Sequence, residues 1–173
     1  MSEANSADVI VKEIANRMNE LLERAESAIN QLDDTQVWYR RDPTDNAVGN
    51  LVLHLVGNLR QWILGGLADQ PDTRDRPVEF STQSGLSKAE LMQMLRETVE
   101  ASCHIIRNLP ADRIAEVKRI QDTNTTIAYA IVMAVSHLGL HVGQIQFITK
   151  SFLRERYQVA CTPPAKKGRG EFW

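Results

Sequence analysis

The stretch from Thr125 to Leu153 is the feature that most limits how this chain can fold. It is rich in apolar residues and contains no proline, so it predicts one long helix. Apolar residues recur along it at spacings of three and four, which gives the helix one broad apolar face. These residues are Ile127, Ile131, Ala134, Val135, Leu138, Val142 and Ile145. Such a face needs other elements to cover it, and the rest of the chain supplies them.

Three further stretches show the same periodicity, at about residues 8–32, 46–67 and 87–109. Each is amphipathic, with charged or polar residues opposite the apolar face. Candidate N-caps are Thr44 or Asp45 for the second helix, Ser87 with Glu90 for the third, and Asn124 or Thr125 for the last. The third helix is expected to end before Pro110.

The connections between these helices are long. Residues 69–86 show no helical period, and residues 111–123 form a second irregular connection in which short extended structure is expected. Helices of about twenty residues or more, joined in this way, predict an all-α protein, a four-helix bundle with long crossover connections. We expect residues 1–158 to form a single helical bundle domain and residues 159–173 to form a flexible C-terminal tail.

Composition narrows the function classes. The chain has a formal net charge of −2, which gives no basic footprint for nucleic acid. The N-terminus lacks the features of a signal peptide, and no uninterrupted apolar run reaches the length of a membrane span. Cys103 and Cys161 lie in different contexts and are expected to be free thiols. These observations predict a cytoplasmic protein without a nucleic-acid or membrane partner.

Two histidines in the last helix, His137 and His141, predict half of a metal site. Residues four apart lie on one face of a helix, so both imidazoles can reach the same ion. Leu138 follows the first histidine, where a metalloprotease helix carries its glutamate base. The third ligand is expected to be His54, which lies at the edge of the apolar face of the second helix.

The simpler interpretation of each histidine is a partly buried side chain that forms a hydrogen bond and binds no metal. The i, i+4 pair and the small and amide residues around His54 favour the metal site. So do three helical glycines, Gly57, Gly139 and Gly143, each of which costs about 1 kcal/mol of helix stability. Such a cost is understandable where helices approach closely or leave a cavity.

Amide side chains lie near the three histidines on helix geometry. Asn50, Asn58 and Gln144 are candidates to line the pocket and to accept the second ring N–H of a metal-bound histidine. No Asp or Glu lies within a helical turn of a candidate ligand on the same face, so no protein base is visible. Arg74 lies in a loop segment of mixed charge and is expected to be solvated. His104 is expected to be a surface or structural residue.

The helices and the spacing of the three histidines resemble the DinB-like superfamily of bacterial four-helix-bundle proteins. The matching residues are His54, in Asn-Leu-Val-Leu-His-Leu-Val-Gly-Asn, and His137 with His141, in His-Leu-Gly-Leu-His-Val-Gly-Gln. The resemblance covers roughly residues 8–153. It implies a divalent metal bound by the three histidines and a homodimer. Characterised relatives include transferases and isomerases that use low-molecular-weight thiols such as bacillithiol or mycothiol.

The resemblance and the residues together predict a metal-dependent protein acting on small molecules. The first hypothesis is transfer of a low-molecular-weight thiol cosubstrate to or from a small electrophile, because a metal-bound thiol is deprotonated at neutral pH. The alternatives are a metal-dependent hydrolase and a non-catalytic, dimeric helical binding or structural protein. Three histidines accept zinc, nickel, iron or manganese, so the sequence does not select the metal.

Overall fold

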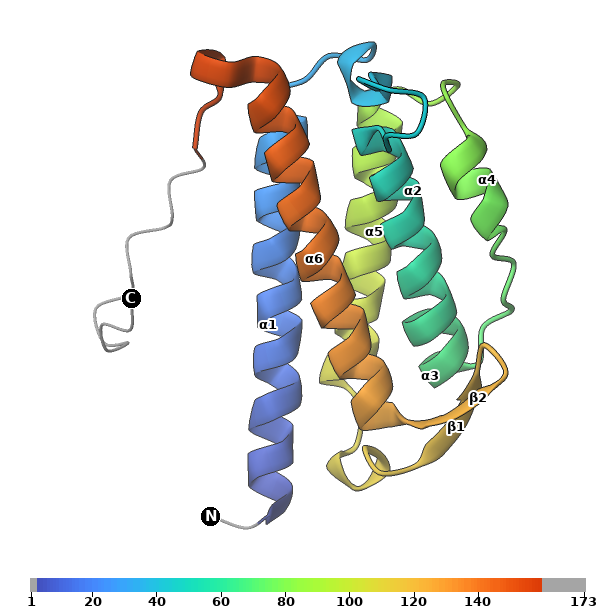
Figure 1. Ribbon diagram of the computed structural model, residues 1–173. Coiled ribbons are helices and arrows are strands. Elements are labelled where there is room, and N and C mark those ends of the chain that lie inside the picture. The colour runs from blue at the N-terminus through green and yellow to red at the C-terminus, as the bar shows by residue number, and fades with distance from the viewer. Residues whose placement is uncertain (1–2, 160–173) are drawn as a thin grey trace, which may run out of the picture.

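The computed structural model describes residues 3–159 and confirms an all-α bundle (Figure 1). The long helices are α1 (Glu3–Ile29), α2 (Val48–Leu59), α5 (Lys88–Arg107) and α6 (Ile127–Leu153). The shorter elements are a π-helical turn (Arg60–Gly65) and α3 (Gly66–Ala68), both continuing α2, then α4 (Arg76–Ser81), β1 (Val117–Ile120) and β2 (Thr123–Thr126). Single 3-10 turns occupy Gln36–Trp38, Ala111–Arg113 and Arg154–Arg156.

The order of helix directions requires a crossover. α1 packs against α5 and α6, and α2 packs against the same two helices from the other side. α2 and α5 run in the same direction, so the chain between them returns along the whole bundle (Figure 1). Lys88, at the start of α5, bonds Leu32 O just after α1, whereas Gly66 at the other end lies against Ile120. This arrangement confirms the predicted long crossover.

The sequence located the helices correctly, but several ends differ. The Ser87 and Glu90 capping box is confirmed: Ser87 Oγ accepts the Glu90 N–H, and Glu90 Oε2 accepts the Ser87 N–H at 2.8 Å. The other two cap predictions were wrong. α2 starts after Ala47, because Asn50 accepts the Ala47 N–H at 3.1 Å. α6 starts after Thr126, since the residues before it pair in β2.

Both connections contain more structure than their sequence indicated. β1 and β2 form an antiparallel hairpin within 117–126, and the buried Ile120 packs on α3 through Gly66; short extended structure was predicted in this connection. The segment 69–86 contains α4, although it was predicted to be irregular. Asp75 caps α4 by accepting the Val78 N–H at 3.3 Å. Six residues are too few to show a helical period, so the pattern could not reveal this helix.

The predicted flexible tail lies almost wholly outside the described residues, as does Cys161. Within them, α6 stands out because Ile127–Arg156 is long and apolar enough to cross a membrane by length and composition alone. The core helix of a bundle passes the same test, and α6 packs along α1 and α2. Only 28% of its most apolar window is buried, which leaves exposed apolar side chains on one face. These include Leu140 and Phe147.

Candidate metal centre

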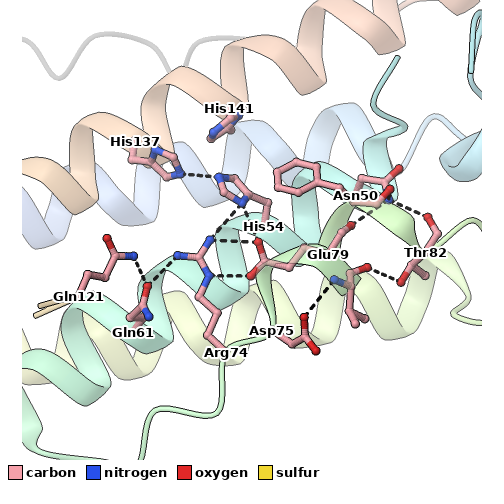
Figure 2. Close-up of polar contacts among 12 residues, drawn as sticks. Asn50, His54, Gln61, Arg74, Asp75, Glu79, Thr82, Gln121, His137 and His141 are labelled. Carbon is pink, nitrogen blue, oxygen red and sulfur yellow. Dashed lines mark hydrogen bonds and ion pairs between the residues drawn. The ribbon is translucent and has the colours of Figure 1, made fainter. Parts of the chain in front are cut away.

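The three predicted ligands come together between two helices. His54 projects from α2, and His137 and His141 project from successive turns of α6 (Figure 2). His137 Nε2 lies 3.0 Å from His54 Nε2, and each histidine offers a ring nitrogen within 4.8 Å of the other two. The ring centroids are separated by 4.4 to 4.9 Å. The three side chains are therefore close enough to hold one metal ion.

The spacing of the ring nitrogens suits a transition metal. With metal–nitrogen bonds of about 2.0–2.1 Å and a tetrahedral angle, two ligand nitrogens stand about 3.3 Å apart. The 3.0 Å between His54 Nε2 and His137 Nε2 is near that value. Within the described residues, the cluster offers three imidazoles and no carboxylate ligand. A donor set of three protein nitrogens leaves further positions of an ion open.

Burial favours the neutral form of His54 and His137, which is the form that binds a metal. Desolvation, with smaller contributions from the neighbouring His141 and His54, lowers the pKa of His137 to about 4. Burial also lowers the pKa of His54, although Glu79 opposes that change. At neutral pH each of these two rings therefore has one nitrogen with a free lone pair.

A buried carboxylate fixes the orientation of His54. His54 Nδ1 lies 2.7 Å from Glu79 Oε2 and 3.1 Å from Arg74 Nη2. The carboxylate is the shorter contact and can only accept, so we assign the proton to Nδ1, which donates to Glu79, while Arg74 Nη2 donates to the same carboxylate oxygen. That tautomer leaves Nε2 as the acceptor that faces His137. Arg74 donates to both oxygens of Glu79, from Nε at 2.7 Å and from Nη2 at 3.0 Å (Figure 2). Glu79 is thus held on the outer side of the His54 ring.

The segment before and within α4 therefore belongs to the site, which the sequence did not predict. The Arg74 and Glu79 side chains are only 5% and 8% exposed, so the expectation of a solvated Arg74 was wrong. Gln61, in the π-helical turn after α2, accepts from Arg74 Nη1 at 2.9 Å and extends the network. A carboxylate does approach the histidines, but it arrives from a distant part of the sequence.

Asn50 holds this segment in place rather than bonding to a histidine. Its Nδ2 donates to Glu79 O at 2.9 Å and to Thr82 O at 2.7 Å. Its Oδ1 accepts from Arg40 Nη2 at 2.9 Å. The Phe80 ring is thereby brought to 4.9 Å from the His54 ring, centroid to centroid. Asn50 thus shapes the site by fixing α4 against α2.

The other two candidate amides differ from each other. Gln144 Oε1 lies 2.6 Å from His141 Nδ1, which is the geometry expected for an amide that accepts the ring N–H. Asn58 makes no hydrogen bond to a histidine among the described residues. Its side chain is buried, and its Oδ1 has no partner within that part of the chain. Gln144 therefore orients one candidate ligand, as Glu79 orients another.

Gly57 supplies a prediction, because a side chain here would overlap Glu79. A Cβ at Gly57 would collide with Glu79 Oε1, whereas a Cβ at Gly139 would meet Leu21 at an ordinary 3.7 Å. Glycine-to-alanine in a helix normally stabilises by about 1 kcal/mol. We expect Gly57→Ala to destabilise by about 1–3 kcal/mol instead, as overpacking does. Urea denaturation measures both variants, and Gly139→Ala is the control that should gain stability.

The remaining candidate residues take structural roles. His104 is exposed on α5, consistent with the surface role considered for it, and lies beside Asn108, the residue after the helix. Cys103 is fully buried, and burial raises the pKa of its thiol to about 11, so it is not a nucleophile at neutral pH. Neither residue contacts the three histidines.

The fold and the site define a helical-bundle protein with a three-histidine cluster between two helices. The family model described as a protein of unknown function, DUF1572, matches residues 5–166, so the chain belongs to this family. A solved structure described as a conserved protein of a locus from Enterococcus faecalis is similar, with a TM-score of 0.65 and 18% identity. The match covers 87% of this chain and 96% of that chain and shows a shared fold. No curated protein matches the sequence.

Proposed function

We propose that the protein is a DinB-like metalloenzyme that uses a divalent transition metal bound by His54, His137 and His141. The convergence of the three imidazoles, with two Nε2 atoms 3.0 Å apart, is the observation that carries this proposal. The proton on His54 Nδ1, held by Glu79, supports it because it turns the ring's lone pair toward the other histidines.

The reaction that suits this site is transfer of a low-molecular-weight thiol to a small electrophile. A divalent ion in this site would lower the pKa of a coordinating thiol and so supply a thiolate at neutral pH. Glu79 is the carboxylate bonded to the triad within residues 3–159, and Arg74 holds both of its oxygens. It is therefore committed to orienting His54 and is not a free base for activating water.

The substrate we propose is a small molecule, in keeping with a compact cluster whose three ring nitrogens all lie within 4.8 Å of one another. The exposed apolar side chains of α6, among them Tyr129 and Val132, would support the homodimer that the DinB-like resemblance implies. We place the protein in the cytoplasm, where low-molecular-weight thiols are kept reduced.

Turnover with a model electrophile tests the function. Metal-loaded protein is mixed with 1-chloro-2,4-dinitrobenzene and a thiol, and the sulfur–carbon bond forms as chloride leaves and the thiol proton passes to solvent. We expect turnover above the uncatalysed rate with thiol, and none with His141→Ala. Ester hydrolysis without thiol would contradict thiol transfer and favour a hydrolase. Bound metal without either reaction would favour a binding protein.

A further inference from the structure

A groove lies beside the metal centre, between α6 and the residues that lead from α1 to α2. Its volume is about 830 Å³, which is large enough for a small organic molecule. Tyr39, Arg40 and Asp45 line one side, and Gln144, Phe147 and Arg154 line the other. We refer to this space as the α6 groove.

One part of the α6 groove is apolar and exposed. Phe147 is 69% exposed and Leu140 is 61% exposed, both unusually high for large apolar side chains on a core helix. Tyr39 and Phe152 form an aromatic wall with their ring centroids 5.0 Å apart. The space beside Gly143 is open, since a Cβ built there would meet no atom within 4 Å. A flat apolar group can therefore lie along α6.

The same groove carries uncompensated positive charge. Arg41 is paired with Asp45 at 3.1 Å. Arg40 Nη2 donates to three neutral oxygens, those of Asn50 Oδ1, Phe80 O and Thr82 O. Neither Arg40 nor Arg154 forms an ion pair with a carboxylate in the part of the chain that the structure describes. The lining therefore has a net charge of about two positive units, which favours an anion.

Gln144 joins the groove to the metal centre. Its side chain lines the groove, and its Oε1 contacts His141 Nδ1 at 2.6 Å. A molecule in the groove would therefore lie about one helical turn from a candidate ligand. This is the position that a second reactant would occupy beside an activated thiol.

We propose that the α6 groove binds a small organic anion, an apolar and preferably aromatic body with a carboxylate or sulfonate group. The apolar body contacts Phe147 and Tyr39, and the anionic group faces the arginines, with Arg154 the freest of them to bind it. The role of this anion as the electrophilic reactant rests on the proposed function. The binding site itself does not, because its residues are separate from the three histidines.

The probe for this site is 8-anilinonaphthalene-1-sulfonate, an aromatic anion that fluoresces in apolar surroundings. We expect saturable binding of one probe per chain, weakened about three- to tenfold by Arg154→Gln and by Phe147→Ala. Arg156→Gln and Tyr129→Ala are the matched controls and should bind like wild type. Arg156 is exposed in the same turn as Arg154, and Tyr129 is an exposed aromatic residue of α6 away from the groove. The neutral probe N-phenyl-1-naphthylamine should bind less tightly, and its affinity should be the same for wild type and Arg154→Gln.

Different results would overturn the anion site in the α6 groove and the proposed metalloenzyme. Probe binding that is equal in all four variants, or equal for the neutral probe, would overturn the anion site. An absence of binding together with a dimer in light scattering would overturn it too, and would indicate that a second copy covers the groove. If His137→Ala still binds the probe and wild-type protein holds no metal, the anion site is supported and the metalloenzyme is rejected.

Discussion

Alanine in place of His137 should remove the bound metal. Wild-type protein, purified without a histidine tag, is expected to hold about one divalent ion per chain, and His137→Ala is expected to bind it at least about a hundredfold more weakly. The physical reason is the 3.0 Å approach of His137 Nε2 to His54 Nε2, which makes His137 the ligand that joins α6 to α2. Two remaining imidazoles cannot enclose an ion as three do. Elemental analysis by mass spectrometry measures the metal directly.

The melting temperature, measured with and without zinc, distinguishes loss of metal binding from loss of folding. Metal that binds only the folded state raises its stability, by about 4 kcal/mol at a thousand times the dissociation constant. The melting temperature of wild type should therefore rise with added zinc, whereas that of His137→Ala should not. His104→Ala is the control, because His104 is exposed on α5 and remote from the cluster. Equal metal content in wild type and His137→Ala would reject the three-histidine site.

Local periodicity was enough to predict the helical bundle and the convergence of His54, His137 and His141. His137 and His141 are four residues apart on one helix, and that relation holds wherever the helix packs. His54 was found because it lies beside the apolar face of α2, and a face of that kind must turn toward the other helices. The ends of helices were predicted less well, since Ala47 and Thr126 become caps only through their surroundings.

The carboxylate of the site could not be found in this way. Glu79 is 25 residues from His54 in sequence, and it reaches the ring because Asn50 fixes the end of α4 from across the crossover. Such a contact has no periodicity. One signal was present, however: Gly57 lies on the same side of α2 as His54, and its cost to the helix predicted a close approach. The group that approaches is Glu79.

Alanine in place of Glu79 should weaken both the fold and the metal site. It would leave Arg74, which is 5% exposed, as an unpaired buried charge, at a cost of about 3–5 kcal/mol. It would also remove the acceptor of the His54 N–H, a change that typically weakens metal binding about 10- to 100-fold. Urea denaturation of metal-free protein measures the first effect, and zinc titration against a chelating dye measures the second. Glu116→Ala is the control, because its pair with Arg113 is exposed and such pairs contribute about 0–1 kcal/mol.

The double variant Arg74→Leu with Glu79→Leu separates the two roles. Replacing a buried ion pair by apolar residues of similar size is often neutral for stability, so the free energy of unfolding should return toward wild type. Zinc affinity should remain low, because leucine cannot accept the His54 Nδ1–H and the tautomer is no longer fixed. Wild-type affinity in the double variant would show that the pair only anchors α4. Low affinity with recovered stability would identify Glu79 as the residue that positions His54.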